Sequence, residues 1–159
     1  MRLYRICPER YLEDYSGLGA SYRDGARWNL QGVPVLYFAA SASLAMLELA
    51  NYLPSPRLVP AQYRLGIYTL PARTRVDTWH VEDLPERWNQ YPYPGAGQQL
   101  GTAWLRSVKR LALRVPSAAV PDGLEHCVLV NPRHPAIDQL KLVGQHGDIY
   151  NTRVFTAQQ

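Results

Sequence analysis

The sequence predicts a single α+β domain with a mixed or mostly antiparallel sheet and flanking helices, and three observations support this. The chain has 159 residues, of which 47 % are hydrophobic, which suits one ordinary domain with its own core. Strand-like and helix-like segments alternate without the regular spacing of βαβ units. No repeat, linker or low-complexity run divides the chain, so residues 1–159 are expected to form one domain.

Two strands are expected early in the chain, separated by a long irregular segment. Arg2–Cys7 predicts an opening strand, and the apolar, β-rich run Pro34–Ala39 predicts a buried one. Between them, Pro8–Val33 contains four glycines and no clear periodicity. Long irregular segments in compact domains are usually functional or disordered.

An apolar helix is expected to follow the second strand. Ser41 or Ser43 can cap its N-terminus, because a serine hydroxyl accepts a hydrogen bond from a free backbone N–H of the first turn. The helix is expected to run to about Leu53, where Pro54 stops it.

The remainder of the chain is expected to complete the sheet and add a second helix. A loop rich in Pro, Gly, Tyr and Asn is expected over Pro85–Gly97, followed by an amphipathic helix over Gln98–Leu111. The strand candidates are runs of apolar, β-branched and aromatic residues bounded by turn formers. They are Gln62–Leu70, Thr74–Trp79, Glu125–Asn131, Leu140–Val143 and Ile149–Phe155, and the segment Leu113–Val115 leads into Pro116 and Ser117 without a strand being predicted there.

Charge and cysteine content exclude several classes of protein. Cys7 and Cys127 are too few for a disulfide framework, and no CxxC pair or metal-ligand spacing of histidines is present, so a reducing cytoplasmic compartment and no metal are expected. Arg5 interrupts any signal peptide. The apolar run Val35–Ala40 is far too short to span a bilayer, so no membrane association is expected.

The basic balance gives only weak support for a nucleic-acid partner. The net charge is +4, and of the 17 basic residues only Lys109 and Lys141 are lysines. Arginine holds phosphate in a bidentate manner, but a GC-rich genome explains most of this excess. The arginines are also scattered along the chain rather than clustered.

Glu48 is the first candidate for chemistry. It is the only formally charged residue between Arg27 and Arg57, and it lies within an Ala- and Leu-rich helix. A glutamate is rarely buried without a partner, because removing a carboxylate from water costs several kcal/mol. The alternative is a narrow solvent-exposed stripe on the helix, shared with Asn51 and Tyr52, and spacing alone does not decide between the two.

Arg27 and Tyr37 are the next candidates. Arg27 ends the long glycine-rich segment and could hold a phosphate or a carboxylate, or could pair with Glu48 for purely structural reasons. Tyr37 lies in the middle of a strand, where its hydroxyl needs a partner and its ring could stack on a planar ligand, although propensity alone favours a core tyrosine at this position.

Other motifs are weaker. Gly17 and Gly19 resemble the start of a dinucleotide fingerprint, but Tyr22 occupies the third glycine position and no strand–helix context is expected there. Ser117 lacks the surroundings of a nucleophile elbow. The segment that begins at Asn131 is most simply a turn that ends a strand.

Taken together, these residues resemble the RES domain, the toxin half of RES–Xre toxin–antitoxin pairs, whose name refers to an Arg, a Glu and a Ser. The resemblance covers nearly the whole chain, with Ala26 in place of a usual Gly and no Asp-x-Arg near the end. Its specific block is Gly25-Ala-Arg-Trp-Asn29, Gly32, Val35-Leu-Tyr37 and Leu44-Ala-Met-Leu-Glu48, and shorter blocks are Leu3–Ile6, Val115–Ser117 and Leu129–Pro135.

The resemblance implies an ADP-ribosyltransferase-like fold that binds NAD+ as substrate, uses no cofactor, and breaks the nicotinamide–ribose bond. It assigns Glu48 to charge stabilisation at the ribose, Arg27 to the pyrophosphate or ribose, and Tyr37 to the nicotinamide. Ser117 would contact the ribose or phosphates, and Asn131 would line the pocket. The implied partner is an Xre-type helix-turn-helix antitoxin that blocks the site.

Depletion of NAD+ by water or phosphate is the favoured activity, because nothing in the sequence marks an acceptor-recognition element. Transfer of ADP-ribose to a cellular protein is the alternative within the same chemistry. An RNA-binding or RNA-cleaving toxin, suggested by the basic pI and the 11 tyrosines, is less favoured since the aromatic residues are dispersed.

Overall fold

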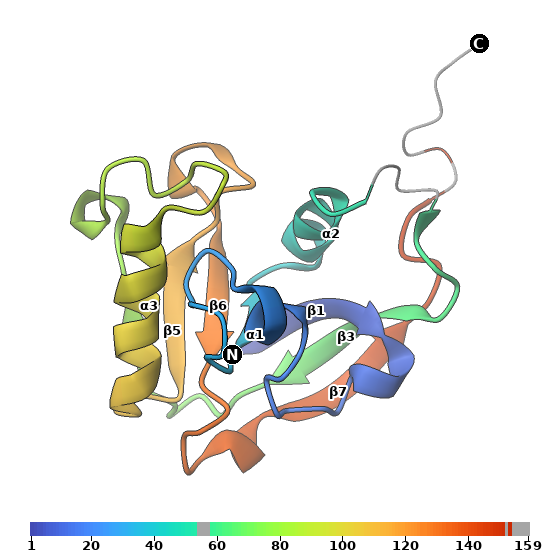
Figure 1. The fold of residues 1–159 in the computed structure, drawn as a ribbon. Helices are drawn as coiled ribbons and strands as arrows, with labels where there is room; N and C mark the ends of the chain where they lie inside the picture. The colour runs from blue at the N-terminus through green and yellow to red at the C-terminus, as the bar shows by residue number, and fades with distance from the viewer. Residues whose placement is uncertain (54–57, 152, 154–159) are drawn as a thin grey trace.

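The computed structural model describes residues 1–53, 58–151 and 153, and a seven-stranded sheet organises them (Figure 1). The strand order is β4-β5-β6-β2-β1-β3-β7, and only the β4–β5 pair is parallel. The predicted α+β class with a mixed, largely antiparallel sheet is therefore confirmed. The strands are β1 Arg2–Pro8, β2 Leu36–Ala39, β3 Tyr63–Thr69, β4 Val76–Thr78, β5 Ala112–Pro116, β6 His126–Val130 and β7 Lys141–His146. The helices are α1 Ala20–Asp24, α2 Ala42–Ala50 and α3 Gly95–Ser107. Short 3₁₀ turns cover Glu9–Tyr11, Val81–Asp83, Pro121–Gly123 and Ile137–Gln139.

The sheet consists of two parts that meet at a narrow junction. All seven residues of β1 pair with β3, but Tyr4 alone pairs across to β2, at Ala39. In Figure 1, β5 and β6 lie beside α3 on one side of the molecule, and β1, β3 and β7 lie on the other. Helix α2 begins directly after this junction, where the Ser41 hydroxyl accepts a hydrogen bond from the Leu44 N–H at 3.1 Å.

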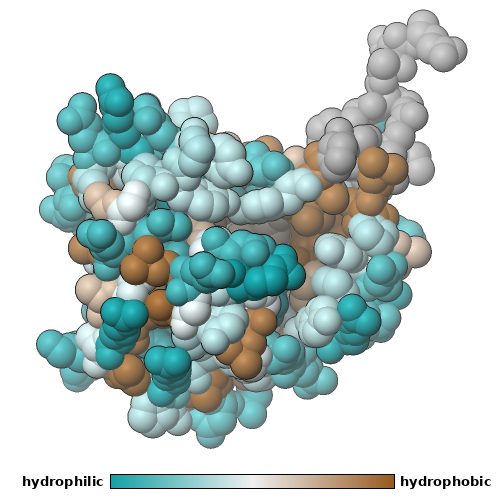
Figure 2. Space-filling view, viewed as in Figure 1, coloured by the Kyte–Doolittle hydropathy of each residue, from teal (hydrophilic) through white to brown (hydrophobic). Residues whose placement is uncertain are grey.

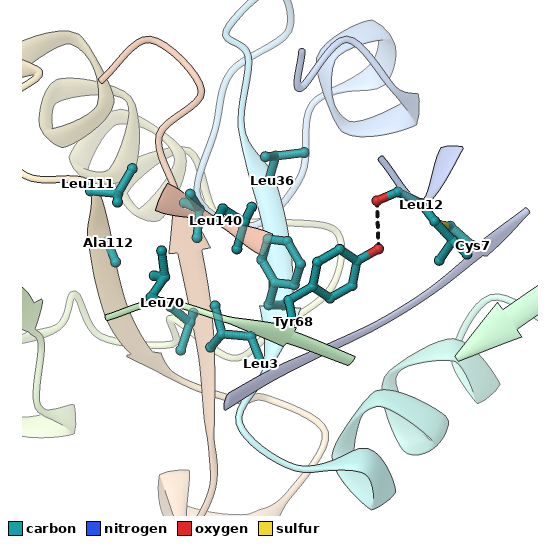
Figure 3. Packing of buried hydrophobic residues seen from close by; sticks show 12 residues of the cluster. Leu3, Cys7, Leu12, Leu36, Tyr68, Leu70, Leu111, Ala112 and Leu140 are labelled. Carbon is teal, nitrogen blue, oxygen red and sulfur yellow. Dashed lines mark hydrogen bonds between the residues drawn. The ribbon is translucent and has the colours of Figure 1, made fainter. Parts of the chain in front are cut away.

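Both longer helices cover the same face of the sheet. Alternate residues of a strand point to opposite faces. Leu36 and Phe38 pack in the cluster around Tyr68, whose hydroxyl donates to the Leu12 carbonyl at 2.8 Å (Figure 3). Tyr37, between them, instead faces the cluster that contains Leu105 of α3. The face that carries Tyr37 is thus the one on which the helices can place functional side chains.

The boundaries of the helices differ from the predicted ones. Helix α3 begins at Gly95, inside the predicted loop, and ends at Ser107. It ends there because Val108 adopts a left-handed conformation, with φ of 51°. Leu111, which was assigned to the helix, is instead a buried core residue just before β5. The predicted irregular segment after β1 contains α1, too short to show a periodic pattern.

Other predicted boundaries are confirmed in part. Ser41, not Ser43, is the cap of α2, and the helix ends at Ala50 rather than near Leu53; Pro54 lies outside the described residues. The described residues of the predicted closing strand, Ile149–Phe155, form no strand, and the others fall outside the described part. No helix in the described part of the chain is long and apolar enough to cross a membrane.

Candidate functional site

Glu48 lies on α2 and is joined to the ends of two neighbouring strands. Its Oε1 accepts a hydrogen bond from the Ser117 hydroxyl at 2.6 Å and another from the Cys127 thiol at 3.2 Å. Ser117 directly follows β5, and Cys127 in β6 pairs with Val115 of β5. A half-buried carboxylate with two donors on one oxygen is therefore held at the start of β6.

The helix that carries Glu48 is only partly buried. Leu44 and Ala45 are buried against Ala39, whereas Leu47 is 43 % exposed. Figure 2 shows apolar side chains gathered on the surface beside α2. The apolar residues of the helix therefore serve partly for core packing and partly form an exposed apolar face. Glu48 is accordingly neither fully buried nor on a fully exposed stripe.

Arg27 is held by the loop that precedes α3. Its Nη1 donates to the carbonyl oxygens of Trp88 at 2.7 Å and Gln90 at 2.9 Å. Its guanidinium carbon also lies 5.2 Å from the centre of the Tyr93 ring, a distance suited to a cation–π contact. Among the described residues Arg27 forms no ion pair with Glu48, so the purely structural Arg27–Glu48 pair is not present.

The backbone around Arg27 is fixed by Tyr37. The Tyr37 hydroxyl accepts from the Trp28 N–H at 3.2 Å and donates to Asn29 Oδ1 at 2.8 Å. Asn29 is fully buried, and its amide donates to three carbonyl oxygens. Burial raises the pKa of Tyr37, so the phenol remains protonated and its hydrogen bonds persist at neutral pH.

Helix α3 supports the arginine loop, Gly25–Asn29, from the other side. Gln98 donates to the Ala26 carbonyl at 3.0 Å. Thr102 accepts from the N–H of Leu30, just after the loop, at 2.9 Å. Gly101 allows the closest approach, because a Cβ there would lie 2.0 Å from the Trp28 carbonyl oxygen. The helix and loop can touch in this way only with a glycine at that position.

Glu48 and Arg27 both influence the pKa values of Cys127 and Tyr52, in opposite directions. Burial and the Glu48 charge raise the pKa of Cys127 well above its ordinary value, while Arg27 opposes the rise. Burial, the hydrogen bond to Tyr93 and the Glu48 charge raise the pKa of Tyr52, and Arg27 again opposes. The hydroxyls of Tyr52 and Tyr93 lie 3.0 Å apart. Both charges therefore influence Cys127 and Tyr52, and the tyrosine pair connects the segment just after α2 to the loop that holds Arg27.

The two remaining candidate residues differ in their positions. Ser117 joins Glu48, but its hydroxyl is already used, and the residue is 1 % exposed. Asn131 lies at the opposite end of β6 from Cys127, and its side chain binds the Leu105 carbonyl and the Arg133 N–H. The structure thus brings together Glu48, Ser117, Arg27 and Tyr37, and leaves Asn131 apart. Their contacts with a ligand stay predictions.

Sequence reasoning missed Cys127 and Tyr93 as site residues. No motif marks either one. Cys127 is 79 residues from Glu48 in the sequence and reaches it only once β6 has paired in the sheet. Tyr93 lies in an irregular loop. Tyr52 carried a usable signal, since it falls four residues after Glu48 in the predicted helix, although α2 itself ends at Ala50. Among the described residues, no group of three or more His, Cys, Asp or Glu side chains could hold a metal ion.

Comparisons with known proteins agree with this architecture. The chain is 36 % identical over 135 residues to a protein of Yersinia enterocolitica named Toxin Res, covering 84 % of this chain and 86 % of that protein. It is 33 % identical over 145 residues to the Prs ADP-ribosylating toxin of Sphingobium sp., covering 89 % and 87 %. The fold resembles a chain of the M. tuberculosis MbcT–MbcA toxin–antitoxin complex, with a TM-score of 0.71 at 21 % identity over 92 % of this chain and 82 % of that one. Since the family model of the RES domain matches residues 2–151, the chain belongs to the RES domain family.

Proposed function

We propose that the protein is the toxin of a toxin–antitoxin pair and that it depletes NAD+ by cleaving the nicotinamide–ribose bond. The names of its relatives support a toxin, and one of them is an ADP-ribosylating toxin. The observation that carries the proposal is the Glu48 carboxylate, held at Oε1 by Ser117 and Cys127, together with an Arg27 guanidinium that two backbone carbonyls orient.

The chemistry of NAD+ cleavage needs a carboxylate more than it needs an acid. The nicotinamide ring nitrogen is positively charged while it is bonded to ribose. When the bond breaks, its electron pair moves to that nitrogen, and neutral nicotinamide leaves without taking up a proton. The positive charge then resides on the ribose as an oxocarbenium ion, which a fixed carboxylate stabilises. Glu48 supplies that negative charge, and the ribose carbon is then attacked by phosphate or by water, which releases one proton to the solvent.

The other residues bind and orient the substrate. Arg27 holds the pyrophosphate or the ribose, because two carbonyl acceptors on Nη1 fix the direction of its guanidinium. The Tyr37 ring stacks on nicotinamide while its hydroxyl keeps the arginine loop in place. Ser117 acts on the ribose through Glu48, whereas Asn131, whose amide donates to the Leu105 carbonyl, is given no role at the substrate.

An antitoxin is the proposed protein partner. The structural neighbour was solved as a toxin–antitoxin complex. An Xre-type helix-turn-helix antitoxin would neutralise this chain by placing a segment over the face that carries Glu48 and Arg27.

The test is product analysis after mixing the pure protein with NAD+. We expect chromatography to show nicotinamide and ADP-ribose in phosphate-free buffer. Added phosphate should give ADP-ribose 1″-phosphate in place of part of the ADP-ribose if phosphate competes with water for the ribose carbon. A folded protein that leaves NAD+ unchanged in both buffers contradicts the proposal.

Transfer of ADP-ribose to a cellular protein is the second candidate, and the name of the Sphingobium relative favours it. It uses the same bond cleavage with a different acceptor. Incubation of a cell lysate with NAD+ labelled in the adenylate half separates the two. Label on a discrete protein, with little free ADP-ribose, would identify a transferase, whereas label in free ADP-ribose supports depletion.

A further inference from the structure

We propose that Cys127 is a positioning residue that, together with Ser117, holds one oxygen of Glu48 and thereby turns the other toward the substrate. This inference rests on the proposed function of Glu48. It concerns a residue that no motif in the sequence singled out.

The geometry of the carboxylate is asymmetric. Both donors, the Ser117 hydroxyl at 2.6 Å and the Cys127 thiol at 3.2 Å, bind Oε1. Among the described residues, Oε2 accepts no hydrogen bond. A carboxylate oxygen accepts about two hydrogen bonds in its plane, so Oε1 is satisfied and Oε2 retains its full capacity. The oxygen that is free to act on a ribose is therefore Oε2.

The two donors are themselves fixed. Cys127 pairs with Val115 on one side and with Ala39 on the other, so its Cβ direction is set by the sheet. The Ser117 hydroxyl accepts from the Ala119 N–H at 3.0 Å. Because one donor lies in β6 and the other directly after β5, the position of Oε1 is defined by the sheet rather than by α2 alone.

The thiol is suited to this task because it stays protonated. Its environment includes Glu48, Ser117, Arg27 and Tyr37, and burial and the Glu48 charge dominate, which raises its pKa well above the ordinary value. The S–H group therefore remains a donor throughout the neutral range. A thiol is a weak donor, so Cys127 is expected to adjust the position of Glu48 while Ser117 supplies the stronger bond.

The first test compares three cysteine variants in NAD+ turnover. We expect Cys127→Ala to lower kcat about two- to tenfold, with KM unchanged, because the carboxylate loses one donor while the binding groups remain. Cys127→Ser, which keeps a donor, should recover most of kcat. Cys7→Ala is the matched control, since Cys7 is buried in the Tyr68 cluster on the opposite face of the sheet. Wild-type kcat in Cys127→Ala, or equal losses in the Ala and Ser variants, would overturn the inference.

The second test does not depend on NAD+ turnover. In the Cys7→Ala background, the rate at which iodoacetamide alkylates Cys127 is measured against pH, with Glu48 and with Glu48→Gln. Loss of the Glu48 charge should move the midpoint of the alkylation rate against pH to lower pH. As a control, the two proteins unfolded in urea should be alkylated with the same pH dependence. An unchanged midpoint would overturn the Cys127–Glu48 contact, whereas absence of NAD+ cleavage with a shifted midpoint would refute the proposed function instead.

Discussion

The two charged groups of the site are held in different ways. Glu48 is held by side-chain donors, Cys127 in β6 and Ser117 directly after the neighbouring strand β5. Arg27 is held by backbone carbonyl oxygens of an irregular loop and by an aromatic ring. Substitution of single side chains can therefore loosen Glu48, whereas Arg27 depends on the path of the main chain. We call Glu48 with its donors Ser117 and Cys127 the Glu48 side, and Arg27 with the loop and ring that hold it the Arg27 side. The Glu48 side should control the rate of the reaction, and the Arg27 side should control substrate binding and the stability of the fold.

The largest expected effect is on the Glu48 side. Glu48→Gln keeps the shape and an acceptor for Ser117 but removes the charge, so NAD+ turnover should fall by about 10²–10³-fold. The matched control is Glu125→Gln, because Glu125 is another half-buried carboxylate that accepts from a serine hydroxyl, that of Ser41 at 2.7 Å. Turnover by Glu48→Gln equal to that of Glu125→Gln would remove Glu48 from the mechanism.

The close contact between α3 and the arginine loop gives the next largest effect. Gly101→Ala places a Cβ 2.0 Å from the Trp28 carbonyl oxygen, which forces the helix or the loop to move. We expect a loss of about 3 kcal/mol in the free energy of unfolding, measured by urea denaturation. Gly95→Ala in the first turn of the same helix meets nothing within 4 Å and should leave stability nearly unchanged. Equal stability of the two variants would mean that this contact is not tight in solution.

Arg27→Ala should act on binding. Hydrogen bonds to a charged group contribute about 1.5–3 kcal/mol, so KM for NAD+ should rise about 10- to 100-fold, with a smaller change in kcat. Arg27→Lys should recover little, because a lysine cannot reproduce the planar fork that two carbonyls orient. Steady-state kinetics measures both constants, and a fall in kcat alone would contradict the difference between the two sides.

Tyr37→Phe tests how the strand supports the arginine loop. It removes the acceptor for the Trp28 N–H and the donor to Asn29, which leaves buried polar groups without a partner. The free energy of unfolding should fall by about 1–2 kcal/mol, as measured by urea denaturation. Unchanged stability would show that water or another group replaces the phenol.

The smallest effect is expected where the two sides meet. Tyr52→Phe removes the exposed hydrogen bond to Tyr93 just beyond the end of α2 but keeps the ring. An exposed hydrogen bond of this kind contributes little, so KM should change about twofold. A change as large as that of Arg27→Ala would mean that the tyrosine pair, rather than the arginine loop, determines binding.

Much of the fold could be predicted from local patterns. The Ser41 cap and the strand before it are confirmed because both depend on neighbouring residues. The predicted C-terminal end of α3 was wrong. Leu111 continues the helical spacing of apolar residues, but the left-handed conformation of Val108 has already ended the helix. Periodicity records which residues are buried, and does not distinguish a helix residue from a core residue just beyond the helix.

The site was predictable to a different degree on its two sides. Glu48 stands out because it is a lone charge in an apolar helix, and its partner Ser117 belongs to a block of the family resemblance. The partners of Arg27 are carbonyl oxygens of Trp88 and Gln90. A backbone carbonyl exists at every position, so no side-chain pattern can indicate which ones a distant arginine will bind.

The most direct test of the proposed role of Glu48 is to determine which bond of NAD+ is broken. Proton NMR of NAD+ mixed with a small amount of the pure protein distinguishes free nicotinamide from nicotinamide mononucleotide. We expect free nicotinamide to accumulate as the signal of the nicotinamide-ribose anomeric proton of NAD+ disappears. Accumulation of nicotinamide mononucleotide and AMP would place the reaction at the pyrophosphate and contradict the role of Glu48.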